Sequence, residues 1–90
     1  MPMKAVVLYR PRSDHAREVT DFNRDYKRRT GKELEFIDID TRDGQAKARA
    51  YDITQYPAIL ATREDNGQAL QIWQGTPLPM IDTVSYYDDK

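Results

Sequence analysis

The sequence predicts a single α/β domain in which a four-stranded mixed sheet is flanked by three helices. Three observations support this prediction. Lys4–Tyr9 is a short, nearly continuous apolar run rich in β-branched residues, which is typical of a central strand buried on both faces. A helix and a second strand follow it, and such a strand–helix–strand unit places its two strands parallel. Asn66-Gly67 then indicates a hairpin, so the last two strands run antiparallel.

The first helix has the clearest pattern in the chain. Pro11 ends the preceding strand because proline has no N–H for the ladder. We expect Ser13 or Asp14 to cap the helix N-terminus and Gly31 to cap its C-terminus. Apolar residues then recur at steps of three and four and make one stripe: Ala16, Val19, Phe22 and Tyr26.

The second half of the chain contains the other predicted elements. They are a strand at Leu34–Ile39, a short helix at Gln45–Asp52, and strands at Ala58–Thr62 and Leu70–Trp73. We expect Thr76 to cap a last helix with Pro77 and Pro79 in its first turn. Its inward residues are expected to be Met80, Ile81 and Val84, with Tyr87 a further candidate. The expected core includes Val6, Leu8, Val19, Phe22, Ile37, Ile39, Ile59 and Ile72.

Length and charge narrow the class of protein. Ninety residues make one domain, 1–90, with no room for a second core. A net charge of −1 does not favour nucleic acid or an anionic membrane, so we expect neither as a partner. No apolar run approaches the roughly 20 residues that a membrane span needs. The chain also shows no secretory signal segment, so a cytoplasmic location is expected.

The sequence contains no cysteine. This excludes disulfides, metal sites with cysteine ligands and thiolate nucleophiles. His15 is the only histidine and cannot build a zinc site with histidine ligands. The carboxylates of Asp38, Asp40 and Asp43 could suit magnesium, but acids are also typical where a parallel strand emerges into solvent. We expect no metal and no cofactor.

Two local motifs resemble the thioredoxin family. Phe36-Ile-Asp-Ile-Asp40, followed by Ala50-Tyr-Asp-Ile-Thr-Gln-Tyr-Pro57, is similar to the thioredoxin run from its third strand to its cis-proline. The Asn66-Gly67 hairpin and Gly75 also fall where thioredoxins place a hairpin and a glycine. The resemblance covers nearly the whole chain but lacks the extra N-terminal strand and helix of full-length thioredoxins, and in this it looks like the smaller glutaredoxin-type core.

The resemblance implies a thioredoxin-like, four-stranded mixed sheet with strand order 2-1-3-4. It also implies a cis peptide bond at Pro57, just before the third strand. The first and last helices are expected on one face of the sheet and the short helix on the other.

The departures from the family concern its chemistry. Thioredoxins and glutaredoxins place Cys-x-x-Cys two residues after a proline, and counting from Pro11 those positions are Ser13 and Ala16. Many thioredoxins also bury an acid six residues before the first cysteine, where this chain has Val7. We expect no thiol–disulfide activity and no catalytic residue, which favours a protein that is not an enzyme but leaves that question open. Catalysis by Ser13 or His15 is the least favoured alternative.

The vacated site leaves two binding hypotheses. The leading one is a non-catalytic module that binds a protein or peptide in a groove beside Pro57. The alternative is a site for a small anion or a glutathione-like ligand, or an accessory domain of an enzyme. Arg10-Pro11-Arg12-Ser13 resembles the Lys-Pro-x-Cys segment of glutaredoxins. Gly75-Thr76-Pro77 departs from the residues with which glutaredoxins bind glutathione. Both arginines could also simply be solvated loop residues. The candidate residues are Arg10, Arg12, Ser13, His15, Tyr56, Pro57, Gly75 and Thr76.

Overall fold

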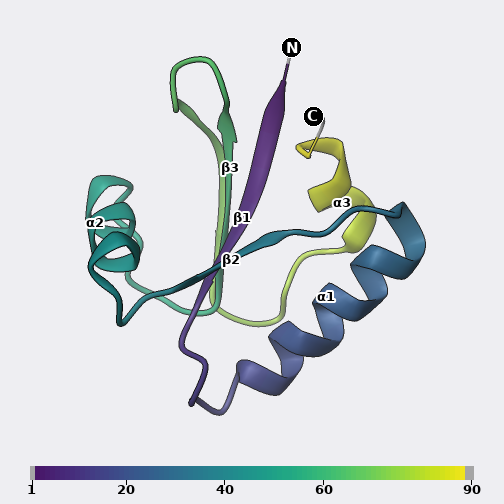
Figure 1. The fold of residues 1–90 in the computed structure, drawn as a ribbon, viewed down its shortest axis with the longest axis horizontal. Helices are drawn as coiled ribbons and strands as arrows, with labels where there is room; N and C mark the ends of the chain where they lie inside the picture. The colour runs from purple at the N-terminus through teal and green to yellow at the C-terminus, as the bar shows by residue number, and fades with distance from the viewer. Residues whose placement is uncertain (1, 89–90) are drawn as a thin grey trace.

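The computed structural model describes residues 2–88 and contains four strands and three helices (Figure 1). In chain order they are β1 Met3–Tyr9, α1 Ala16–Thr30, β2 Glu35–Asp38, α2 Arg42–Ala50, β3 Ala58–Arg63, β4 Ala69–Gln74 and α3 Ile81–Tyr86. The strand order is β2-β1-β3-β4, so the predicted fold class is confirmed. Each strand lies within two residues of its predicted bounds at either end.

β1 lies at the centre of the sheet because both of its edges are paired. It runs parallel to β2, with Tyr9 opposite Asp38, and antiparallel to β3, with Leu8 opposite Ala58. β3 pairs antiparallel with β4, and the register shifts between Ala61 and Thr62. The apolar run of β1 is buried from position 5 to position 8, as expected for a central strand.

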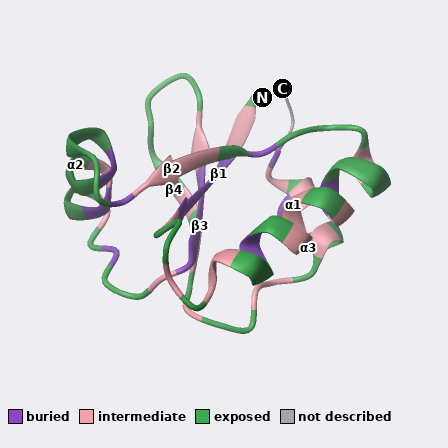
Figure 2. Cartoon of the chain, turned by 60° about the horizontal axis from the view of Figure 1, so that its bottom comes forward, coloured by how far each residue is buried: buried purple, intermediate pink, exposed green. Residues whose placement is uncertain are grey.

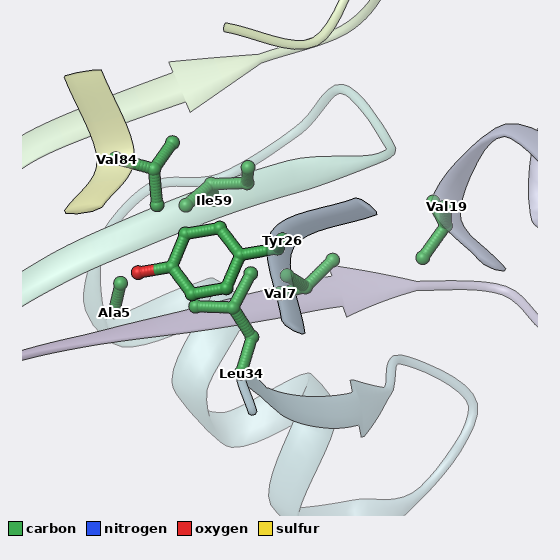
Figure 3. Packing of buried hydrophobic residues seen from close by; sticks show 7 residues of the cluster. All are labelled: Ala5, Val7, Val19, Tyr26, Leu34, Ile59 and Val84. Carbon is green, nitrogen blue, oxygen red and sulfur yellow. The ribbon is translucent and has the colours of Figure 1, made fainter. Parts of the chain in front are cut away.

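Two apolar clusters cover the two faces of the sheet. The cluster beneath α1 and α3 is Ala5, Val7, Val19, Tyr26, Leu34, Ile59 and Val84, and the Tyr26 ring lies in its midst (Figure 3). The cluster beneath α2 is Val6, Leu8, Ile39, Ala48, Ile53, Ala58 and Leu60. The helices therefore occupy the predicted faces, and their outer sides are largely exposed (Figure 2). Of the expected core, Phe22, Ile37 and Ile72 are only partly buried.

The start of α1 differs from the prediction. Its N-cap is His15, and neither Ser13 nor Asp14 caps it. The Ser13 hydroxyl instead donates to the carbonyl oxygen of Arg10 at 2.7 Å, because the chain makes a turn before the helix begins. The prediction for Gly31 is confirmed: its φ of 76° is left-handed, and its N–H donates to the carbonyl of Lys27.

The second helix spans Arg42–Ala50, so it begins three residues before the predicted range Gln45–Asp52 and ends two residues before the end of that range. Thr41 is its N-cap, and its hydroxyl accepts from the N–H of Gly44 at 3.1 Å. Gly44 is buried, and a Cβ there would overlap the main-chain carbonyl of Asp38. The missing side chain thus sets how closely α2 approaches the end of β2.

The last helix begins five residues after Thr76, so the predicted cap at Thr76 is wrong. Met80 is the N-cap, and Pro77 and Pro79 lie outside the helix. A residue before proline avoids the helical conformation, and Leu78 precedes Pro79, which delays the helix. Met80 is 73% exposed rather than inward, whereas Val84 is fully buried as expected. None of the helices in residues 2–88 has the length and apolar character that a membrane crossing requires.

Candidate functional site

The strand register brings most candidate residues to one end of the sheet. β1 ends at Tyr9 where β3 begins, because Leu8 lies opposite Ala58. β4 ends at the same place, because Ala58 lies opposite Gln74. We call this end, with the turn 10–15 that follows β1, the Pro57 end of the sheet.

Pro57 is fully buried and fastened to the segment after β4. Its carbonyl accepts from the N–H of Gly75 at 2.9 Å. The peptide bonds Tyr56–Pro57 and Thr76–Pro77 are both cis. Gly75 has a left-handed φ of 81°, which glycine adopts without strain. Thr76 is exposed beside it.

Gln74 holds the segment that precedes Pro57. Its side-chain oxygen accepts from the N–H groups of Thr54 and Gln55, at 2.8 and 3.1 Å. One exposed glutamine thus fixes two consecutive main-chain donors across the end of the sheet. Gln74 was not among the predicted site residues, because nothing in the local sequence distinguishes a glutamine at a strand end from any other glutamine.

The Tyr56 side chain is partly buried. Its ring packs against the cluster beneath α2, and its hydroxyl donates to the carbonyl of Ile53 at 3.1 Å. The ring therefore lies on the α2 side of the sheet. In contrast to the side-chain hydroxyl, the main-chain N–H and C=O of Tyr56 have no hydrogen-bond partner within residues 2–88.

The turn after β1 is held by Ser13 and His15, which both bond to Arg10. The Arg10 carbonyl accepts from the Ser13 hydroxyl, and the Arg10 N–H donates to Nε2 of His15 at 3.1 Å. No hydrogen bond joins Ser13 to His15 within the described residues. The structure therefore does not prepare Ser13 as a nucleophile with His15 as its base.

Burial lowers the pKa of His15, and the nearby Arg10 charge lowers it further, against the opposing charges of Glu18 and Asp14. A lowered pKa favours the neutral imidazole. The hydrogen bond accepted by Nε2 also requires this neutral form, since a protonated imidazole has no acceptor. His15 thus serves as a neutral acceptor that fixes the turn.

The two arginines of the site differ. The Arg10 guanidinium lies 3.3 Å from a carboxylate oxygen of Asp40, and both side chains are more than half exposed. Arg12 is exposed and has no ion pair among the described residues. Asp40 was not among the predicted site residues. It lies beside Arg10 because β1 and β2 are parallel and end at the same edge.

The position of the missing acid is occupied by a buried aliphatic side chain. Val7 is 1% exposed, within the cluster beneath α1. The described residues also contain no group of three or more potential metal ligands.

Chains of known structure share this arrangement at low sequence identity. The thioredoxin of Fasciola hepatica is 16% identical, with a TM-score of 0.70 over 97% of this chain and 82% of that chain. The reduced thioredoxin pre-protein of Schistosoma mansoni is also 16% identical, with a TM-score of 0.68 over 94% and 74%. The chain has a thioredoxin-like fold. Oxidized mitochondrial thioredoxin 3 of Saccharomyces cerevisiae also matches, with a TM-score of 0.64, 12% identity and coverage of 93% and 74%.

The predicted resemblance is thereby confirmed at the level of the fold. No family model and no curated protein matches the sequence itself. In this thioredoxin-like fold, Ser13 lies in the turn before α1 and Ala16 is the first residue of the helix. The chain thus has the fold without any cysteine.

Proposed function

We propose that the chain is a redox-inactive thioredoxin-like module that binds an extended segment of a partner protein at the Pro57 end of the sheet. The main observation in favour is the unpartnered main chain of Tyr56. An extended peptide can pair with main-chain donors and acceptors that have no partner within the protein. The absence of cysteine supports the redox-inactive part of the proposal.

The rigidity of the surroundings supports the same surface. Gln74 fixes the main chain before Tyr56, and the Gly75 N–H bonds to the carbonyl of Pro57 after it. Groups that are already held in place lose little freedom on binding, which favours affinity. Exposed Thr76 and Arg12 offer additional contacts at this end of the sheet.

The small-anion alternative has weaker support. The Arg10 guanidinium already faces Asp40, and an incoming anion would have to compete with that carboxylate. Of the two site arginines, Arg12 has no ion pair within residues 2–88, and it lies near the exposed Asp14 in sequence. A thermal-shift series with phosphate, carboxylates and glutathione separates the two functions, because a bound ligand raises the apparent melting temperature.

The peptide function is tested by selecting binders from a displayed library of random peptides and measuring their affinity for variants. Thr76→Trp should block the Pro57 end and weaken the selected peptides at least about tenfold, the loss of roughly 1.4 kcal/mol. Thr83→Trp, at an exposed position of α3, is the matched control and should leave affinity unchanged. Equal affinity for both variants would place the binding elsewhere.

A further inference from the structure

The outer edge of β2 is a second open surface of the sheet. β2 ends the sheet order β2-β1-β3-β4, and no strand within residues 2–88 lies on its outer side. An edge strand presents main-chain N–H and C=O groups with which another extended chain can pair. β2 is only four residues long, so a partner strand there would also be short.

A groove lies along this edge, between β2 and α2. Its volume is 690 Å³, and Figure 1 draws α2 beside the end of β2. Ile37 and Tyr51 contribute apolar surface to it from the margin of the core. Ala46 and Ala50 lie one helical turn apart on α2 and line the same groove. These small side chains leave room for the side chain of a partner.

The charges around the groove are mostly negative. Glu35, Asp38 and Asp43 line it, against one base, Lys47. Glu35 pairs with Lys4 at 2.5 Å, and Asp38 accepts from the N–H of Asp40 at 2.8 Å. Asp43 has no ion pair among the residues that the structure describes. A partner with basic side chains complements this surface, and an acidic one is repelled.

We propose that β2 accepts an extended basic segment of a partner protein as a fifth strand. Main-chain hydrogen bonds to the β2 edge supply the pairing, and alternate side chains supply specificity. One apolar side chain of the segment enters the groove against Ile37 and Ala46. The basic residues two positions before and after it share the same face, on the side of Glu35 and Asp43. The residues that line this groove are not those of the Pro57 end, so variants can test the two surfaces separately.

The test uses the synthetic pentapeptide Lys-Thr-Val-Thr-Lys, in which both lysines and the valine share one face when extended. Its dissociation constant is measured by NMR titration of the full chain. Ala46→Trp should fill the groove and weaken binding at least about tenfold. Gln45→Trp, exposed on α2 but outside the groove, is the matched control and should bind within about twofold of the wild type.

Two further comparisons separate strand pairing from charge attraction alone. Asp43→Asn should weaken binding by about two- to fivefold, as expected for one exposed ion pair. Peptides N-methylated at odd or at even residues should differ, because only one set faces β2, and one of them should lose binding. The proposal is overturned if the peptide does not bind, if Glu-Thr-Val-Thr-Glu binds equally well, if both methylated peptides bind like the parent, or if Ala46→Trp has no effect.

Discussion

The hydroxyl of Tyr26 donates to Oδ2 of Asp88 at 2.9 Å, and both residues are fully buried. This bond joins α1 to the segment after α3, across 62 positions of sequence. Lys32 adds a second link by donating to the Asp88 carbonyl at 2.7 Å. Burial raises the pKa of the Tyr26 phenol far above its ordinary value, and the bond to Asp88 adds to this rise. The pair fastens the end of the described chain to the core.

Replacing Tyr26 with Phe should lower the free energy of unfolding by about 1–3 kcal/mol, because a buried carboxylate loses its donor. The other oxygen of Asp88 is also buried and has no partner within residues 2–88, so nothing nearby replaces the lost bond. Urea unfolding measures the change. Tyr86→Phe is the matched control, since Tyr86 is 71% exposed, and equal stability of the two variants would contradict a role for the buried bond.

Replacing Gly44 with Ala should lower stability by about 1–3 kcal/mol, because the new Cβ overlaps the Asp38 carbonyl and pushes α2 from β2. The helix propensity of alanine works in the opposite direction, so a net loss would identify the close approach as the cause. Gln45→Ala, at the adjacent exposed position, should stay within about 0.5 kcal/mol of the wild type. A stabilised Gly44→Ala protein would show that α2 has room to move.

Lowering the pH should destabilise the chain through His15. Its pKa in the folded state is lowered, so the unfolded state binds the proton more tightly. The stabilising contribution is complete above the unfolded pKa and is lost as the pH falls through the folded one. Urea midpoints at about pH 7.5 and about pH 5.5 measure this loss. Glutamine accepts a hydrogen bond but does not titrate, so the His15→Gln variant should lose less stability between the two pH values. An NMR titration that places the His15 pKa above 6.5 would contradict the prediction.

Replacing Gln74 with Ala should release the segment before Pro57, because two N–H groups lose their acceptor. Amide hydrogen exchange at Thr54 and Gln55 should become faster, and peptide affinity at the Pro57 end should fall. Gln74→Glu keeps an acceptor oxygen and should keep slow exchange at both amides. Unchanged exchange in the alanine variant would mean that the segment is held by other contacts.

The strands and the packing faces of the helices could be predicted from sequence because each depends on a local pattern. The β1 run and the stripe of α1 specify which sides are buried, and the order of elements restricts the topology. The helix starts were less predictable, since several residues can serve as a cap. Ser13 bonds backward to Arg10, Thr41 caps where no cap was expected, and Pro79 delays α3 beyond Thr76.

The candidate site was predictable only in part, for a physical reason. Arg10 and Pro57 come to one end of the sheet because the strand topology requires it. The contacts made there by Asp40, Gln74 and the Tyr56 ring depend on the direction of side chains, which single-residue patterns do not encode.

The most direct test of binding at the Pro57 end is an amide shift map of the full chain with a peptide selected from the random library. The shifts should concentrate on the main chain of Tyr56, on Gly75 and Thr76, and on the turn 10–15. They should be absent in Thr76→Trp and preserved in Thr83→Trp. Shifts confined to β2 and α2 would contradict binding at the Pro57 end and leave the β2 edge as the binding surface.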